Sequence, residues 1–287
     1  MEPTDLFPTH APKTTHPHVG KRNQEAVDVG IGRNNYGKDH FLNTNFGEAG
    51  CWGNPYPKSE YGLTDCLIAF GLRFTDAIAT DEETRQQVME LEQQDLGCYC
   101  HELGYEDTPP MDGSRDNHYC HGDIIAHWAN ELNNPTGVGI GVCGSRDIWN
   151  AYHSQLRGKA SIIKLVSRGI DAADNINEDE LDAIVHGAND KSPDAWGSMY
   201  ADHHDLINHS IWPNHNIFGN EEFLLRNSAI IANLLTYKES HLIAFWDGVS
   251  NGTKDTINKA RDVGIPVTIV NLEDDQHQWL DENMLDL

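Results

Sequence analysis

The chain changes its pattern at about Gly137, and this change constrains the fold more than any other feature. From there onward, short apolar runs alternate with longer segments of helical periodicity. The strand candidates are residues 139–143, 183–186, 242–246 and 267–270. The helix candidates are residues 147–156, 194–207, 221–235 and 253–263, and residues 161–180 look like an insertion. This alternation predicts an α/β domain with a parallel sheet covered on both faces, whose ligands bind beyond the carboxyl ends of the strands.

A chain of 287 residues is long enough for two domains, and the turn-forming run at residues 133–137 marks the break between them. We predict a smaller α+β domain over residues 34–134 and the α/β domain over residues 137–272. Residues 1–33, rich in Pro, Thr and His, are predicted to be a disordered tail, and residues 273–287 an acidic tail. The elements expected in the smaller domain are helices beginning near Thr64, Asp81 and His121 and a strand at residues 96–100.

The charge of the chain is strongly acidic, with 45 Asp and Glu residues against 20 Lys and Arg residues and a formal net charge of −25. Such a surface suits concentrated salt, where the Debye length falls to roughly 3 Å at 1 M and self-repulsion is screened. A charged, disordered chain is a poorer interpretation, because the acids are scattered among intact apolar segments. We therefore predict a halophilic protein.

The same composition bears on partners and location. No cluster of Lys and Arg residues is present, so duplex nucleic acid is not an expected partner. No apolar run approaches 18 residues, and the first residues lack a cationic start followed by a hydrophobic stretch. We expect no membrane partner and a cytoplasmic location, which is the host cytoplasm if the gene is viral. Association with a second copy of the chain, a homo-oligomer, stays open.

Glycine-containing loops follow three of the predicted strands. The loop residues that we expect to bind a ligand are Gly144, Ser145, Arg146, His186, Gly187, Gly248, Ser250, Gly252 and Thr253. Unpaired backbone amides and the helix dipole favour an anion at such places. A single glycine-rich turn more often only shapes the chain, but three in register within one domain indicate a small molecule that carries phosphate.

The order of short motifs through this domain resembles the YspA-like branch of the SLOG superfamily, which includes the DNA-processing Smf proteins and the LOG phosphoribohydrolases. The motifs are G-S-R after the first strand, H-G-A after the second, Arg226-Asn227 in a helix, A-F-W-D-G-x-S-x-G-T and a final G-I-P-V. The likeness covers residues 137–272. It implies a Rossmann-like fold that binds nucleotides or their derivatives, with the G-x-S-x-G-T loop at the phosphate and Asn227 among the ligand-binding residues.

The resemblance also implies an activity. In the LOG enzymes, an Arg in the corresponding helix and a Glu just after G-T support cleavage of the base from a nucleoside monophosphate. Arg226 matches the first, whereas Asp255 stands near the second place and is one methylene shorter. A displacement of about 1 Å can cost on the order of 100-fold in rate. Arg226 and Asp255 are the predicted catalytic residues, and Asp194 is the candidate counterpart of the acid that the family carries after the second strand.

Both predicted catalytic residues have a simpler interpretation. Arg226 could be a cation on the surface of its helix. Asp255 could be a charge that favours the first turn of the helix it belongs to.

Four candidate metal ligands occur in the smaller domain, namely Cys98, Cys100, Cys120 and His121. Two thiolates on one face of a strand and a Cys-His pair fit tetrahedral zinc in ligand type, although their spacings are not the common C-x₂-C. We predict a structural zinc ion here. Buried free cysteines and a catalytic thiol are the other interpretations.

The motifs of the smaller domain resemble an uncharacterised domain family found in phages and microbes, over residues 34–132. They are C-W-G-N-P-Y from Cys51, D-L-G-C-Y-C from Asp95 and C-H-G-D from Cys120. The family has no established activity to carry over. The Trp52-Gly53-Asn54-Pro55 turn could offer an aromatic face for stacking a base, and a packed turn is the alternative.

The leading functional hypothesis is a protein that binds a nucleotide derivative, with hydrolysis of an N-glycosidic bond as its candidate reaction. In it, Arg226 orients phosphate or ribose and Asp255 supplies the carboxylate. The alternative is a non-catalytic nucleotide sensor or scaffold whose N-terminal domain is stapled by zinc.

Overall fold

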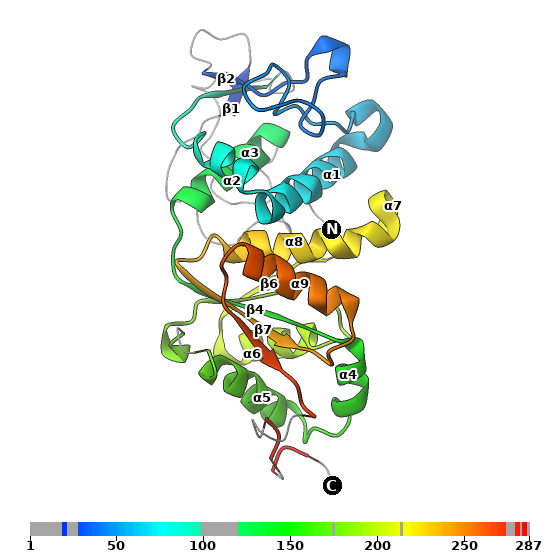
Figure 1. The fold of residues 1–287 in the computed structure, drawn as a ribbon, viewed down its shortest axis with the longest axis vertical. Coiled ribbons are helices and arrows are strands. Elements are labelled where there is room, and N and C mark those ends of the chain that lie inside the picture. Colours follow the sequence, from blue (N-terminus) through cyan, green and yellow to red (C-terminus); the bar gives the residue numbers. More distant parts are fainter. Residues whose placement is uncertain are drawn as a thin grey trace. The chain divides into compact units, whose positions relative to one another are not determined.

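The structure is a computed structural model of the chain (Figure 1). It describes residues 19–21, 28–98, 120–173, 176–212, 215–273, 279–281 and 283–285. The chain divides into two compact units, Met1–Asn134 and Pro135–Leu287, which are called unit 1 and unit 2 below. The division lies inside the turn-forming run at residues 133–137.

Unit 2 is built around a five-stranded sheet in which neighbouring strands are parallel. The strands are β4 (Val138–Gly144), β5 (Ala183–His186), β6 (Ile207–Ser210), β7 (Glu239–Phe245) and β8 (Val267–Val270). Their order across the sheet is β6-β5-β4-β7-β8, so the chain moves outward from β4 to β6 and then returns to the other side of β4. The predicted Rossmann-like parallel sheet is confirmed. The reversal of strand order creates a crevice beyond the carboxyl ends of β4 and β7.

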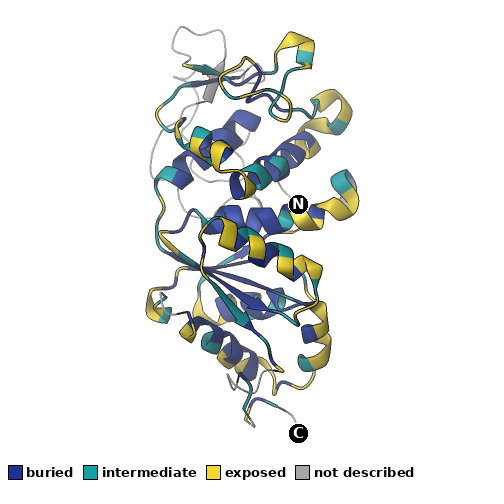
Figure 2. Ribbon diagram, viewed as in Figure 1, coloured by how far each residue is buried: buried dark blue, intermediate teal, exposed yellow. Residues whose placement is uncertain are grey.

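Helices cover both faces of this sheet (Figure 1). On one face α5 (Lys159–Asp171) packs with α6 (Asp194–His204), and on the other α8 (Glu222–Leu234) packs with α9 (Asn251–Asp262). The shorter helices of the unit are α4 (Arg146–Tyr152), α7 (His215–Phe218), η4 (Glu178–Glu180) and η5 (Gly219–Glu221). The central strands β4 and β7 are buried over most of their length, as a sheet covered on both faces requires (Figure 2).

Two predictions for this unit are wrong. The single helix expected over residues 194–207 ends at His204, because Asp205 adopts a left-handed backbone conformation with φ 56°, and the unpredicted strand β6 follows. The supposed insertion at residues 161–180 contains α5, a crossover helix packed closely on the sheet. A Cβ added at Gly169 of α5 would lie only 2.9 Å from Ile243 Cγ2 of β7.

The C-terminal residues that the structure describes are part of unit 2 and not a free acidic tail. Trp279 and Met284 are buried in its core. Leu285 pairs with Leu156 in an isolated antiparallel bridge, and Asp281 forms ion pairs with Lys164 and Arg168 at 2.8 Å. The apolar residues of this acidic segment, Trp279, Leu280, Met284 and Leu285 among them, were the signal that the composition obscured.

Unit 1 combines a small parallel sheet, in the order β1-β3-β2, with helices. Its elements are β1 (Val19–Lys21), β2 (Val29–Gly30), η2 (Asn35–Gly37), α1 (Lys58–Thr80), α2 (Glu82–Met89), β3 (Leu96–Cys98) and α3 (His121–Asn133). Both β1 and β2 lie within residues 1–33, so the prediction of a disordered tail is wrong there. Residues 1–18 and 22–27 lie outside the described residues.

The Trp52-Gly53-Asn54-Pro55 turn is packed into the core of unit 1. The Trp52 ring is buried and lies 5.1 Å from Phe46 and 6.5 Å from Phe74, centroid to centroid. The Asn54 side chain donates to the Cys66 carbonyl at 3.2 Å. The interpretation of this turn as a base-stacking face is therefore wrong, and the packed turn is correct.

No helix in the described parts of the chain has both the length and the apolar character that crossing a membrane would need.

We expect Ile243→Ala to lower the free energy of unfolding of unit 2 by about 2–5 kcal/mol, because removing a fully buried side chain loses apolar contacts and leaves a cavity. Urea denaturation at constant salt measures this. Val249→Ala is the control, since Val249 is 80% exposed and its truncation should change stability by less than about 0.5 kcal/mol. Equal effects of the two substitutions would contradict the packing of β7 described above.

Candidate functional site

A cavity of about 620 Å³ lies beyond the carboxyl ends of β4, β5 and β7 in unit 2. Its lining comes from the end of β4, the loop after β5, the first half of α8 and the start of α9. A volume of roughly 300–1,000 Å³ is typical of sites for small molecules. Of the predicted ligand-binding residues, those that line it are Gly144, Arg146, Gly187, Asn227, Ser250, Gly252 and Thr253.

The loops after β4 and β7 meet at the point where the strand order reverses. The Ser145 hydroxyl lies 3.4 Å from the Thr253 hydroxyl and accepts a hydrogen bond from the Asp247 N–H at 3.4 Å. The Asp247 carboxylate in turn accepts from the N–H groups of Val249 and Ser250. Burial raises the pKa of Asp247, but hydrogen bonds from Ser250, Val249 and Ser145 outweigh it, so the pKa lies below its usual value. The ionised carboxylate thus fixes the turn that leads into α9.

The start of α9 offers backbone amides to the cavity. Its first intrahelical hydrogen bond runs from the Lys254 N–H to the Ser250 carbonyl, and Ser250 gives no side-chain cap. A Cβ added at Gly252 would meet nothing within 4 Å, so the backbone borders open space there. Uncapped amides at the positive end of a helix favour an anion.

Arg226 is a largely buried cation of the cavity wall, with a side chain that is 14% exposed. Its guanidinium donates to the Gly187 carbonyl and to Asn227 Oδ1, both at 3.0 Å. Its Nε is buried and has no hydrogen-bond partner among the described residues. A Cβ at position 187 would lie 2.7 Å from the Arg226 Cζ, so only glycine leaves room for this side chain. The interpretation of Arg226 as a surface cation is wrong.

Two carboxylates line the cavity, those of Asp190 and Asp194, and the one beside Arg226 is that of Asp194, which begins α6. It is 5% exposed, and its Oδ2 lies 4.0 Å from an Arg226 nitrogen and accepts from the Asn189 N–H at 3.3 Å. The predicted catalytic Asp255 is not part of the lining. It accepts from Asn227 Nδ2 at 3.0 Å and pairs with Lys259 at 2.9 Å. Asp194 therefore lines the cavity, where we expected Asp255 to lie. The motifs had indicated Asp194 only as the candidate counterpart of the acid that the family carries after the second strand.

Three other residues predicted to bind the ligand do not line the cavity, namely Ser145, His186 and Gly248. Ser145 ties the two loops together, and Gly248 provides a turn position with φ 80°. His186 Nδ1 accepts from the Ala188 N–H at 3.1 Å, and its Nε2 lies 2.8 Å from Asn208 Oδ1. This neutral ring shapes the loop after β5 and does not reach a ligand.

The charges and aromatic groups of the cavity suit an anion with an apolar part. The cationic residues of the lining are Arg146, Lys191 and Arg226. The acidic ones are Asp190 and Asp194. The lining thus carries one more positive than negative charge in a chain of net charge −25. Trp212 and Phe223 also line the cavity although they are 53% and 40% exposed, and no motif in the sequence indicates that these two rings share a site.

Cys143 at the end of β4 lines the same cavity. Burial raises the pKa of its thiol, and Asp194 raises it further against the opposing effect of Arg226. A thiol with a raised pKa is a poor nucleophile, so the environment of Cys143 favours a packing role.

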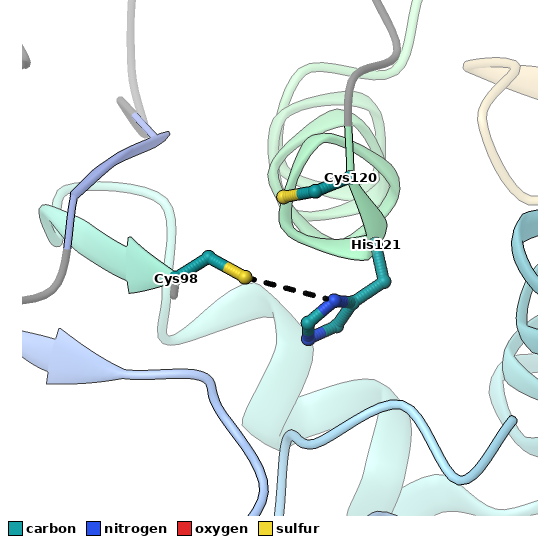
Figure 3. Close-up of side chains that lie close together, drawn as sticks. All are labelled: Cys98, Cys120 and His121. Atoms are coloured by element: carbon teal, nitrogen blue, oxygen red, sulfur yellow. Dashed lines mark hydrogen bonds between the residues drawn. The ribbon is translucent and has the colours of Figure 1, made fainter. Parts of the chain in front are cut away.

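Unit 1 contains a separate cluster of metal-ligand type, formed by Cys98 at the end of β3 and by Cys120 and His121 at the start of α3 (Figure 3). All three residues are buried, and one ligand atom of each lies within 4.8 Å of the others. The three residues could hold a metal ion. The fourth predicted ligand, Cys100, lies outside the described residues.

The hydrogen bonds of the cluster prepare it for a cation. His121 Nε2 lies 2.8 Å from the Ile31 carbonyl, which can only accept, so Nε2 carries the proton. The Nδ1 lone pair then faces Cys98 Sγ at 3.8 Å (Figure 3). A backbone partner on the outer nitrogen is the usual support of a metal-binding histidine.

A capping box sets the position of Cys120 and His121. Cys120 is the N-cap residue of α3, and its Sγ accepts from the Gly122 N–H at 3.2 Å while Asp123 Oδ2 accepts from the Cys120 N–H at 2.8 Å. The positive end of α3 stabilises negative charge on sulfur at this place. The C-H-G-D motif is thus a helix start that presents two ligand atoms.

Comparison with known proteins identifies the first unit only. Residues 16–131 match the family model described as Domain of unknown function (DUF4326). The chain therefore contains a DUF4326 domain next to a Rossmann-like α/β unit, and the match begins well before residue 34, where we expected the domain to start. No curated protein and no solved structure matches the chain.

We expect the stability of unit 2 to depend on pH through His186. Burial lowers its pKa below the ordinary value of 6.5, while Asp194, Asn208 and Asp202 oppose this and Arg226 adds to it. The unfolded chain therefore takes up the proton first, and stability that is present above pH 6.5 is lost as the pH falls.

Thermal unfolding followed by circular dichroism between about pH 7.5 and 5.5 measures this decline. His186→Gln should make the decline shallower, whatever its effect on the midpoint at pH 7.5. His203→Gln, at an exposed position, is the control. Its thermal midpoint should fall with pH as steeply as that of the native chain. An equal decline in all three proteins would show that His186 is not a buried neutral group.

Proposed function

We propose that unit 2 binds a phosphate-bearing nucleotide derivative in the 620 Å³ cavity, with the phosphate at the amino end of α9. The single observation that carries the proposal is the convergence of the uncapped amides around Gly252 with the buried guanidinium of Arg226 on one cavity. Asn227 joins the two, because it accepts from Arg226 and donates to the Gly252 carbonyl at 3.2 Å. A fixed cation and oriented amides are the usual means of holding phosphate.

The aromatic side chains favour a nucleotide over inorganic phosphate. Trp212 and Phe223 both line the cavity and remain partly exposed. The Arg226 guanidinium lies over the Phe223 ring, 5.7 Å from its centroid, so Trp212 is the ring that we propose stacks on a base. Stacking of a base on an aromatic ring is worth about 1–3 kcal/mol. The likeness of the motifs to the SLOG superfamily agrees with this class of ligand.

For the reaction, we propose that Asp194 replaces Asp255 as the working carboxylate of an N-glycosidic hydrolysis. As the bond from ribose C1′ to the base nitrogen breaks, its electron pair leaves with the base and positive charge develops on the ribose. A carboxylate in a site shielded from water stabilises that charge. Water then adds to C1′, and its proton passes to the carboxylate or to the leaving base. Arg226, 4.0 Å from Asp194, holds the neighbouring phosphate or ribose oxygen.

A non-catalytic nucleotide sensor is the second candidate function. The observation that favours it is the engagement of both carboxylates, since Asp194 lies beside Arg226 and accepts from Asn189, while Asp255 is paired with Lys259. A carboxylate held in this way is less free to act as a base, although it still orders the phosphate site.

For unit 1, we propose that Zn²⁺ occupies the cluster of Cys98, Cys120 and His121. Two thiolates and one imidazole are ligands that zinc prefers, and the buried, pre-oriented arrangement supports it.

We expect nucleoside monophosphates to raise the thermal midpoint of the full chain, because a ligand that binds the native state adds about 2.7 kcal/mol of stability at 100 times its Kd. Arg226→Gln should weaken the apparent affinity about tenfold or more through the loss of charge-assisted hydrogen bonds. Arg261→Gln removes the same charge from an exposed position of α9 and is the matched control. Equal affinities of the two variants would contradict the proposed phosphate site.

Incubation with nucleoside monophosphates, followed by chromatography of free bases, tests the reaction. We expect release of base by the native chain, a loss of at least about 100-fold in rate with Asp194→Asn, and a smaller loss with Asp255→Asn. Binding without release of base from any nucleotide would exclude the hydrolase and leave the sensor. A larger loss with Asp255→Asn would restore the carboxylate assignment made from the motifs.

A further inference from the structure

The zinc cluster of unit 1 lies on the wall of a second cavity. This cavity has a volume of about 360 Å³ and is lined by all three cluster residues together with, among others, Arg33, Asn54 and Lys58. A metal ion whose only task is to hold the chain together is normally enclosed by four protein ligands. Here the three ligand residues border open space, which is the arrangement of centres that keep a coordination position for a ligand.

The charge of this cavity points to an anion. Arg33 and Lys58 contribute positive charge, and no Asp or Glu occurs among the described residues of the lining. Neither cation forms an ion pair with a described carboxylate, although the chain carries 45 acidic residues. A lining whose described residues include two cations and no carboxylate is unusual in so acidic a chain, and it matches an oxyanion approaching a cation.

The backbone around Arg33 fixes its place at the cavity. A Cβ added at Gly53 would lie 2.8 Å from the Arg33 Cα, so the W-G-N-P turn and the Arg33 segment are in close contact. The Asn54 side chain, held by the Cys66 carbonyl and by the Tyr56 N–H, forms the neighbouring wall. The distinctive turn of this domain therefore serves to build the cavity that reaches the cluster.

From these observations we infer that the cluster is a ligand-binding centre and not a structural staple. A small molecule that carries a phosphate or carboxylate group completes the coordination of the metal from the cavity side, and Arg33 and Lys58 neutralise the remaining charge. The inference rests on the zinc occupancy proposed above. It gives unit 1 an oxyanion site of its own, separate from the cavity of unit 2.

The test uses the full chain with cobalt(II) in place of zinc, because the visible absorption of cobalt bound to thiolates reports on its coordination and is blind to events in unit 2. Inorganic phosphate and acetate are titrated separately. We expect one metal ion per chain and a saturable spectral change with at least one anion, and the anion that acts distinguishes a phosphate from a carboxylate ligand. Arg33→Gln should weaken that anion about tenfold. Lys38→Gln, an exposed position nearby that does not line the cavity, should not.

Two further variants decide how the coordination is completed. Cys98→Ser should lose the metal, with circular dichroism checking the fold, whereas Cys100→Ser should keep the metal and the response to the anion. Metal binding without any spectral response, or loss of the metal in Cys100→Ser to the same extent as in Cys98→Ser, would overturn the inference and leave a closed zinc site. A native chain that binds neither zinc nor cobalt would overturn the zinc proposal itself.

Discussion

The cavity of unit 2 is built around a largely buried guanidinium group, that of Arg226. Placing a charge away from water is costly unless it is paired and hydrogen-bonded. Arg226 donates to a carbonyl and an amide oxygen and lies over the Phe223 ring, but the Asp194 carboxylate is 4.0 Å away and Nε has no hydrogen-bond partner among the described residues. An anion in the adjoining cavity would complete this arrangement. Relief of this desolvation cost by an anion is the physical basis of the phosphate site that we propose here.

The surrounding structure serves to hold that cation in place. Gly187 gives the guanidinium room, and Asn227 connects it to the start of α9. The Asp247 turn and the Ser145 hydroxyl then join the loops after β7 and β4. These contacts meet where the order of the parallel strands reverses, so the topology of the sheet and the chemistry of the cavity lead to the same place.

The sequence predicted the parts of the fold that follow from local pattern. The strands at residues 183–186 and 267–270 are confirmed to the residue. The helix expected to begin near Asp81 is also confirmed, since Asp81 is its N-cap and its carboxylate accepts from the N–H groups of Glu83 and Thr84. It failed for β1 and β2, because strands of two or three residues have no periodicity to detect. It also merged β6 with α6, since the left-handed conformation of Asp205 is not visible in a continuous polar segment. At the site, the strand-to-helix pattern found the glycine loops and the resemblance to a known family pointed to Arg226, but neither could show that Asp194 and not Asp255 lines the cavity or that Trp212 and Phe223 line it together.

Isothermal titration calorimetry of the full chain with a nucleoside monophosphate and with the matching nucleoside tests the central claim most directly. The two ligands differ only in the phosphate, so the difference in affinity measures what the buried cation and the amides of α9 contribute. We expect the monophosphate to bind at least about 100-fold more tightly than the nucleoside, which is equivalent to about 2.7 kcal/mol of binding free energy. Equal affinities for the two ligands would show that no phosphate site exists around Arg226 and Gly252.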